Sequence, residues 1–256
     1  MKILITGGLS GLGFSVAKCL SLKGHIVYLG VRTKKEKDYL NEKLKREKLI
    51  MFPLVLDLTT DNYTIPSDID ILYLNASIGK GGSVLELNSN YLTDTFNVNI
   101  LGNVRLIKKY LENRKKGRIV ITSSLAGLLP LPYLYSYTYT KLSLYHLANT
   151  LRLECLYQGL DVRITTILPG AYYTGFNQVM IDNKDKSDFV YEAKALKMTK
   201  YQHLLFDLIE KKDLTNFAKI VSKKITKEKP PFIISIPIGQ YLFTKLYLLI
   251  NWLLFL

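Results

Sequence analysis

The amino-acid sequence predicts an α/β protein built as a single domain around a doubly wound parallel sheet. Three observations lead to this prediction. Apolar runs of strand length alternate with longer amphipathic stretches, which is the pattern of repeated βαβ units. The runs are continuous and rich in β-branched residues, as expected for strands buried on both faces of a parallel sheet. No linker, repeat or low-complexity tract divides residues 1–256, and this length suits one domain with a sizeable core.

The expected elements follow one another in a regular order. Seven short apolar runs predict strands at residues 2–6, 25–31, 49–57, 69–75, 117–123, 161–168 and 232–236. Between them, helical apolar spacing predicts helices at residues 11–24, 34–48, 90–114 and 136–158. Residues 175–215 are mostly polar and irregular and are expected to form a helical, substrate-covering flap. Residues 232–256 are expected to form an apolar C-terminal strand and helix.

One stretch gives conflicting signals. In YLYSYTYTK, residues 133–141, tyrosine occupies every second position, a period typical of a strand. The run ends on Lys141, however, and the residues after it have helical spacing. We therefore interpret the stretch as the start of a helix from about Ser136, in which Tyr137 and Lys141 share a face because residues four apart are neighbours.

Composition narrows the possible functions. The formal net charge is +14, and such a charge attracts phosphates, anionic membranes, acidic proteins and nucleic acid alike. No nucleic-acid motif accompanies it, and the lysines are scattered over helical stretches, so we expect solvated helix faces and no nucleic-acid partner. Cys19 and Cys155 lie far apart, without a CxxC pair or a Cys/His cluster. Neither a disulfide framework nor a metal site is predicted.

A glycine-rich turn follows the first expected strand. In TGGLSGLG, residues 6–13, Gly7 would supply the tight turn, Gly11 the close approach of a pyrophosphate, and Gly13 the packing of helix against strand. The N-terminus of the next helix would then face the phosphates. The pattern is moderately specific for a dinucleotide in this position; a turn without a ligand is the alternative.

The end of the second strand bears on the choice of cofactor. Val31 stands where an acidic residue would bind the ribose 2′-hydroxyl of NAD, and Arg32 follows it. An arginine offers a planar fork to a 2′-phosphate, so NADP(H) is expected in preference to NAD(H), although Arg32 could simply begin an exposed helix. Asp57 ends the third strand beside the expected adenine, and Asn75 ends the fourth, where it would fix the turn beside the cofactor or simply form a turn.

A serine, a tyrosine and a lysine carry the expected chemistry. Ser124 lies at the C-terminal end of the fifth strand, Tyr137 comes thirteen residues later and Lys141 four after that. A free tyrosine titrates near pKa ≈ 10, and a nearby ammonium favours the phenolate, so Lys141 is expected to lower the pKa of Tyr137 toward the range useful for acid–base catalysis. Tyr133, Tyr135 and Tyr139 have no lysine four residues on.

Taken together, these motifs resemble the short-chain dehydrogenase/reductase family. TGGLSGLG, LNASIG, VNILG, SSLAG, YTYTK and PGAYYT occur in the family's order, and the resemblance covers essentially the whole chain. It implies a Rossmann-type fold and a nicotinamide cofactor. The implied catalytic residues are Asn99, which would hold a water in the proton relay, Ser124, Tyr137 and Lys141. The implied cofactor-binding residues are Thr6, Gly7, Gly11, Leu12, Gly13, Arg32, Asp57, Leu58, Asn75, Ala76, Tyr137, Lys141, Pro169, Gly170 and Thr174.

The sequence also departs from the family pattern. Leu74-Asn75-Ala76-Ser77 replaces the usual Asn-Asn-Ala-Gly, with the loss of one side-chain amide and one glycine, which bears on cofactor affinity and not on the catalytic set. Tyr139 and Thr140 stand where Ala and Ser are common, and the bulky Tyr139 must find its own space.

The expected activity is NADPH-dependent reduction of a hydrophobic ketone or aldehyde, or oxidation of the corresponding alcohol, with Tyr137 as the acid–base group. The apolar residues 128–135 are expected to line the substrate pocket. A 3-oxoacyl-carrier-protein reductase and a non-catalytic NADP-binding regulator or scaffold are the alternatives.

A homodimer or homotetramer is implied by the resemblance. The chain is expected in the cytoplasm, and residues 239–256 leave a peripheral membrane contact open, in competition with internal packing or a subunit interface.

Overall fold

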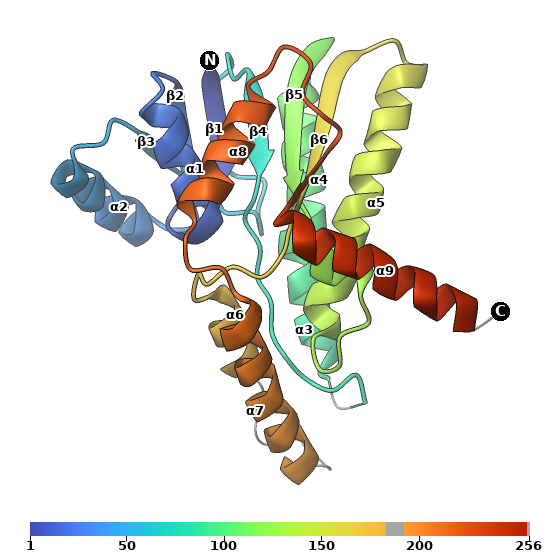
Figure 1. Ribbon diagram of the computed structural model, residues 1–256. Helices are drawn as coiled ribbons and strands as arrows, with labels where there is room; N and C mark the ends of the chain where they lie inside the picture. Colours follow the sequence, from blue (N-terminus) through green and yellow to red (C-terminus); the bar gives the residue numbers. More distant parts are fainter. Residues whose placement is uncertain (86, 183–191, 255–256) are drawn as a thin grey trace.

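A computed structural model describes residues 1–85, 87–182 and 192–254 as a seven-stranded, wholly parallel sheet with helices on both faces (Figure 1). The strand order is β3-β2-β1-β4-β5-β6-β7, so the chain winds outward in one direction, returns to the middle and winds outward in the other. The strands are β1 (Lys2–Thr6), β2 (Ile26–Val31), β3 (Phe52–Val55), β4 (Ile71–Leu74), β5 (Lys116–Thr122), β6 (Asp161–Pro169) and β7 (Ile233–Ile236). This confirms the doubly wound α/β sheet and the single domain. The strand order reverses between β1 and β4, and in such sheets a crevice opens at the carboxyl ends of the strands at this point.

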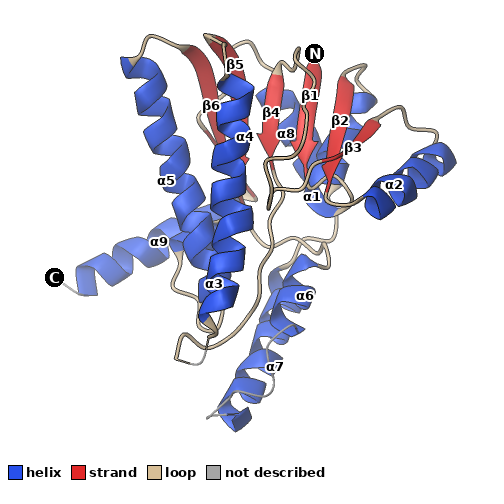
Figure 2. Ribbon diagram, turned by 180° about the vertical axis from the view of Figure 1, so that it is seen from behind, coloured by secondary structure: helices blue, strands red, loops and turns tan. Residues whose placement is uncertain are grey.

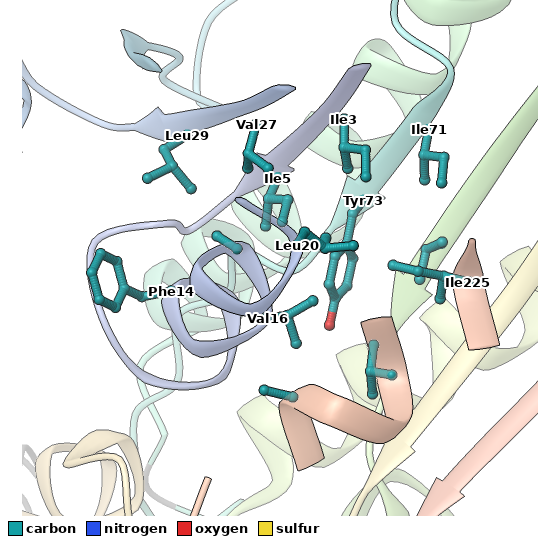
Figure 3. Packing of buried hydrophobic residues seen from close by; sticks show 14 of the residues in the cluster. Ile3, Ile5, Phe14, Val16, Leu20, Val27, Leu29, Ile71, Tyr73 and Ile225 are labelled. Atoms are coloured by element: carbon teal, nitrogen blue, oxygen red, sulfur yellow. The ribbon is translucent and has the colours of Figure 1, made fainter. Parts of the chain in front are cut away.

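Two helical layers cover the sheet. The face in front in Figure 1 carries α1 (Gly11–Ser21), α2 (Lys34–Glu47) and α8 (Thr215–Ile225), and the opposite face carries α4 (Gly102–Leu111) and α5 (Tyr135–Tyr157) (Figures 1 and 2). Strand side chains alternate between the two cores. Ile3 and Ile5 enter the first core and Leu4 the second. In Figure 3, Ile5 and Tyr73 of neighbouring strands pack with Leu20 from α1.

Two expected strands are shorter than predicted. The third was expected at 49–57 and spans Phe52–Val55, because the N–H of Leu49 is used in closing the C-terminus of α2, where Lys48 adopts a left-handed conformation with φ 53°. The Leu49 N–H is therefore not available to a neighbouring strand. The fourth strand was expected at 69–75 and spans Ile71–Leu74. Its last predicted residue, Asn75, leaves the ladder to bond Thr6.

The helix expected at 90–114 is instead three consecutive pieces. These are α3 (Ser89–Phe96), a π-helical turn (Asn97–Leu101) and α4, which begins at Gly102. A Cβ on Gly102 would lie 2.5 Å from the carbonyl oxygen of Leu58, so the helix passes close against that loop. π-Helical turns are frequent at functional sites, and this one contains Asn99.

The tyrosine-rich stretch is helical, as predicted. α5 begins at Tyr135, one residue before the expected start. Tyr139 finds its space between other rings: it stacks on Tyr135 at 5.2 Å and on Phe96 at 6.4 Å between ring centroids, and its hydroxyl donates a 2.7 Å hydrogen bond to the carbonyl of Leu92.

The last elements extend beyond the sheet and its layers. α6 (Phe176–Asp182) and α7 (Glu192–Ile209) occupy the region expected to be a helical flap; the part of that flap at 183–191 lies outside the described residues. After β7, α9 (Ile238–Leu254) runs outward from the body to the C-terminus (Figures 1 and 2). No helix in the described part of the chain has the length and apolar character needed to cross a membrane.

Candidate active site

The glycine-rich turn brings β1, α1 and the end of β4 close together. Gly7 has φ 65°, and a Cβ there would lie 2.8 Å from the Cα of Ala76. A Cβ on Gly13 would lie 2.5 Å from the side-chain nitrogen of Asn75 and 2.6 Å from the carbonyl oxygen of Gly7. Both positions therefore need glycine for reasons of backbone packing, as predicted for Gly13. Gly11, with φ 60°, faces Thr174 instead.

Thr6 and Asn75 tie the ends of β1 and β4. The Thr6 hydroxyl oxygen accepts hydrogen bonds from the backbone N–H of Asn75 at 2.9 Å and of Ala76 at 3.0 Å. The Asn75 side-chain amide donates back to the carbonyls of Thr6 at 3.2 Å and Gly7 at 3.4 Å. Asn75 and Ala76 line the cleft, whereas Thr6 lies behind it and positions them.

Two charged side chains line the cleft near the end of β2, and only one of them was predicted from the sequence. Arg32 lines the cleft where it was predicted, and so does Glu36. The Glu36 carboxylate accepts the backbone N–H of Arg32 at 2.8 Å and of Thr33 at 3.3 Å, while the Thr33 hydroxyl accepts the N–H of Glu36 at 3.1 Å. This is a capping box, and the T-x-x-E spacing in the sequence is the signal that predicts it. The Glu36 carboxylate places a negative charge at the same end of the cleft as Arg32.

Asp57 and Leu58 lie beside that end of the cleft. One carboxylate oxygen of Asp57 accepts hydrogen bonds from the N–H of Thr59 at 2.9 Å and from its hydroxyl at 2.8 Å. These bonds fix the carboxylate at the carboxyl end of β3.

The three expected reactive side chains meet on the other side of the sheet crossover. Ser124 follows β5, and its hydroxyl oxygen accepts the N–H of Ala126 at 3.1 Å. Tyr137 and Lys141 come from one face of α5, with the Lys141 ammonium 5.5 Å from the centre of the Tyr137 ring. The Lys141 Nζ donates a 3.1 Å hydrogen bond to the carbonyl of Thr122, at the end of β5. All three side chains line the same cleft.

The pKa values at this site differ from the sequence-based expectation. Burial raises the pKa of Tyr137 to about 12, although the hydrogen bond with Ser124 acts in the opposite direction. Burial also lowers the pKa of Lys141 to about 7. The expected lowering of the Tyr137 pKa by Lys141 is therefore wrong for this site, because desolvation has the largest effect on the phenol and burial also disfavours the charged form of Lys141. Tyr137 is held as a neutral phenol at physiological pH.

Asn99 lies behind the cleft and is fully buried. Its side-chain amide donates to the carbonyl of Ile78 at 2.8 Å and to the hydroxyl of Thr140 at 3.0 Å, and its side-chain oxygen accepts the N–H of Ile78 at 2.9 Å. These bonds hold the segment after β4 against α5. The implied role of Asn99 in a proton relay stays a prediction.

One continuous cleft of about 730 Å³ joins these parts. Most of the predicted residues line it: Gly7, Gly11, Leu12, Arg32, Asp57, Leu58, Asn75, Ala76, Ser124, Tyr137, Lys141, Pro169, Gly170 and Thr174. Thr6, Gly13 and Asn99 lie behind its wall. Residues 128–135, which were expected to line the substrate pocket, do not line this cleft; its apolar wall includes Ile78, Val98, Tyr172 and Phe176, and of these Phe176 lies beside Tyr137.

Phe176 and Glu210 are site-forming residues that the sequence analysis missed. The Phe176 ring, in the first turn of α6, lies 5.4 Å from the ring of Tyr137. The buried carboxylate of Glu210 accepts the side-chain amides of Asn177 at 2.6 Å and Gln178 at 2.9 Å, which ties the start of α6 to the residue after α7. No local pattern in the flap sequence signals either contact.

Gln240, in the first turn of α9, joins three segments. Its side-chain oxygen accepts the N–H of Ala171 at 2.8 Å, and its side-chain nitrogen donates to the carbonyl of Ile209 at 2.9 Å. A Cβ on Gly170 would lie 1.9 Å from the same side-chain oxygen. Glycine at 170 therefore permits this three-way contact.

The residues present fit a nicotinamide dinucleotide. A glycine turn packed too tightly for any Cβ at Gly7 or Gly13 brings a helix N-terminus to the cleft wall, and such termini attract phosphate. Ser10, the N-cap residue of α1, makes no capping hydrogen bond with its side chain, so it does not occupy the donors of the first turn. No group of three or more metal-ligating side chains occurs among residues 1–85, 87–182 and 192–254.

Comparison with known proteins identifies the family. The model described as "short chain dehydrogenase" matches residues 1–185, and the chain belongs to this family. It is 24% identical to the uncharacterized oxidoreductase YvaG of Bacillus subtilis, over 87% of this chain and 89% of that protein. It is 26% identical to the 3-ketodihydrosphingosine reductase of Bacteroides thetaiotaomicron, over 95% and 90% of the two chains. With the very-long-chain 3-oxoacyl-CoA reductase of Neurospora crassa it shares 30% identity over 63% of this chain and 53% of that protein.

Solved structures share the fold. A short chain dehydrogenase/reductase from Burkholderia phymatum in complex with NAD superposes with a TM-score of 0.79 at 19% identity, covering 95% of this chain and 91% of that one. An alcohol dehydrogenase from Thermococcus sibiricus complexed with 5-hydroxy-NADP has a TM-score of 0.68 at 21% identity, covering 92% and 95%. The protein is thus an oxidoreductase of a family that binds nicotinamide cofactors.

Proposed function

We propose that the protein is an NADPH-dependent reductase of a lipophilic ketone. The observation that carries the proposal is the meeting of Ser124, Tyr137 and Lys141 in a cleft that also contains the glycine turn. A bound nicotinamide supplies or accepts a hydride. Tyr137, neutral because burial raises its pKa to about 12, donates a proton to the carbonyl oxygen, and the Ser124 hydroxyl orients that oxygen. The protonated phenol is the form that acts as the acid when the carbonyl is reduced.

Lys141 has a positioning and electrostatic role in this proposal. Its Nζ is anchored on the Thr122 carbonyl, 5.5 Å from the Tyr137 ring centre, and it would bind the hydroxyls of the nicotinamide ribose. Since burial lowers its pKa to about 7, a hydrogen-bonding ligand that favours the ammonium would increase its positive charge beside Tyr137.

Arg32 is the residue that supports NADPH over NADH. It lines the cleft after β2, where Val31 leaves no carboxylate for a ribose 2′-hydroxyl. The Glu36 carboxylate at the same end is already engaged by two backbone N–H groups, which reduces its repulsion of a 2′-phosphate. Arg32→Leu should lower kcat/KM with NADPH by at least tenfold and leave the value with NADH nearly unchanged, since a charge-assisted bond to phosphate is worth about 1.5–3 kcal/mol.

The matched control is Arg46→Leu, which removes an exposed arginine from the C-terminal end of α2, the helix that begins shortly after Arg32. It should leave both values unchanged. A wild-type preference for NADH, or equal losses with both cofactors in Arg32→Leu, would rule out the proposed cofactor selection.

Tyr137 and Tyr139 offer a test of the chemistry within one helix. Tyr137→Phe should lower kcat by a factor of about 10²–10⁴, the usual contribution of a general acid, and should retain NADPH binding. Tyr139→Phe deletes a hydroxyl bonded only to the Leu92 carbonyl, so it should cost about 1 kcal/mol of stability and leave kcat unchanged. Retention of the biological role by Tyr137→Phe would instead favour a non-catalytic, cofactor-binding regulator.

The apolar wall formed by Ile78, Val98, Tyr172 and Phe176 supports a lipophilic substrate. Two relatives are named as reductases of 3-keto compounds, a sphingoid base and very-long-chain acyl-CoA, and both names describe lipids. A panel of long-chain 3-keto lipids, a carrier-protein-linked 3-oxoacyl chain and short water-soluble ketones separates the possibilities. We expect long-chain ketones to be turned over fastest; a clear preference for the carrier-linked chain would make the protein a carrier-protein reductase.

A further inference from the structure

The C-terminal helix α9 leaves the body of the protein and has an unusual distribution of side chains. It begins directly after β7, contacts the body through its first turns, and then runs outward past α5 (Figures 1 and 2). Its 17 residues make a helix of about 25 Å.

The helix α9 turns most of its large apolar side chains outward. Its inner side carries Gln240, Thr244 and Asn251 together with the partly buried Tyr241 and Leu248, and Thr244 is only 3% exposed. The large apolar side chains face outward and are each about half exposed or more: Leu242, Phe243, Leu246, Leu249, Ile250, Trp252 and Leu253. A surface helix of a water-soluble domain normally places its apolar stripe against the core, so this outer face requires an apolar neighbour.

The width of the exposed face limits what that neighbour can be. At 100° per residue, the arc from Trp252 through Leu242 to Tyr247 covers about 220° of the helix circumference. A seam between two helices is much narrower, because it uses only two of every seven positions. A continuous apolar medium covers such an arc without a matching groove, and half-buried helices at lipid surfaces have this form.

The charges near α9 suit an anionic surface. The helix contains no Asp or Glu, and its single charged residue, Lys245, is exposed. Lys211 and Lys212, also exposed, follow the Ile209 carbonyl that bonds the first turn of α9. The carboxylates of Glu210 and Asp213 offset these two charges, so Lys245 and the overall charge of the chain supply the attraction. The whole chain has a formal net charge of +14, and each basic residue near an anionic leaflet contributes about 1 kcal/mol.

We propose that α9 docks the protein onto an anionic lipid surface, with the outer apolar arc in the boundary between headgroups and acyl chains. The inner side of the first turns keeps its contacts with the protein, and the helix lies in the plane of the surface. This proposal does not rest on the reaction proposed above, because none of the arc residues lines the catalytic cleft.

Trp252 makes the proposal directly measurable. It is the only tryptophan of the chain, it lies on the outer arc and it is 60% exposed. Adding vesicles of phosphatidylcholine with 30% phosphatidylglycerol should shift its emission to the blue, and lipids brominated near the headgroup should quench it. Vesicles of phosphatidylcholine alone, or 500 mM salt, should weaken the binding at least severalfold because the electrostatic attraction is lost or screened.

A pair of matched double variants tests the face itself. Leu242→Gln with Leu246→Gln, at side chains 59% and 54% exposed, should lower vesicle partitioning at least tenfold. Leu22→Gln with Leu156→Gln makes the same chemical change at 71% and 69% exposed leucines away from α9 and should bind like the wild type. Since all four side chains are exposed, both variants should fold; far-UV circular dichroism and NADPH binding verify this.

Two outcomes would overturn the proposal. The first is a Trp252 spectrum that anionic vesicles leave unchanged. The second is a wild-type dimer, seen by sedimentation without lipid, that the Leu242→Gln, Leu246→Gln variant converts to monomers; the arc would then be an interface between two copies of this chain.

Discussion

Replacing the buried Lys141 by methionine should change how the stability of the protein depends on pH. Burial lowers the pKa of Lys141 from 10.5 to about 7. Between these two values the unfolded chain holds the proton and the native protein does not. The unfolded state therefore binds more protons, and native stability rises with pH across this window. Below pH 7 both states are protonated, and the cost of burying the ammonium is constant.

The expected magnitude follows from the two pKa values. The penalty that Lys141 imposes on the native state is about 4 kcal/mol at pH 7.5 and about 1 kcal/mol at pH 9.5, from proton linkage between the two pKa values. The Lys141→Met variant lacks this penalty at every pH. Its unfolding free energy should therefore exceed that of the wild type by an amount that shrinks by roughly 2–3 kcal/mol between pH 7.5 and pH 9.5.

Urea denaturation at several pH values, followed by circular dichroism, measures this difference. The constant terms, such as the loss of the hydrogen bond to Thr122, shift the whole curve and leave its slope unaffected. Lys108→Met removes an exposed ammonium from α4 and is the control, because its environment changes little on unfolding. Parallel stability curves for wild type and Lys141→Met over this range would refute the conclusion that Lys141 is discharged by burial.

Two further changes test the packing around the cleft. Gly13→Ala should destabilise the protein by about 1–3 kcal/mol and weaken cofactor binding, because the new Cβ would lie 2.5 Å from the Asn75 side chain. Gly239→Ala, with nothing within 4 Å of the new Cβ, is the matched control and should be neutral or stabilising; equal effects in denaturant melts would contradict the packing argument. Glu210→Ala should leave the two amides of α6 without their acceptor, at a cost of about 1–3 kcal/mol each, and so raise the substrate KM and the rate of proteolysis within α6. Unchanged proteolysis would show that this carboxylate does not hold the flap.

The sequence predicted those parts of the protein that depend on short-range patterns. The glycine turn is one example, because the spacing of Gly7 and Gly13 reflects contacts with the immediately following helix and the neighbouring strand end. The start of α5 is another. The lysine four residues after Tyr137 and the helical spacing beyond it correctly predicted a helix, although the alternating tyrosines are typical of a strand. Tyr137 and Lys141 line one cleft.

The features that the sequence did not predict are set by tertiary contacts. The π-helical turn that carries Asn99 is fixed by bonds to Ile78 and to α5, which no local pattern encodes. The apolar wall of the cleft comes from four separate segments and not from residues 128–135. The pKa of Tyr137 moved in the direction opposite to the prediction, because the lysine was visible in the sequence and the burial was not.

The position of Gln240 has a consequence for communication along the molecule. One amide group braces the start of α9 against both the loop after β6, which lines the cleft, and the last turn of α7, which ends the flap. A movement of the outer part of α9 would be transmitted to these two segments through the hydrogen bonds of the Gln240 amide. Coupling free energies are reciprocal. If a ligand on the outer part of α9 favoured one position of the flap, substrate and cofactor that favour the same position would strengthen the binding of that ligand by the same factor.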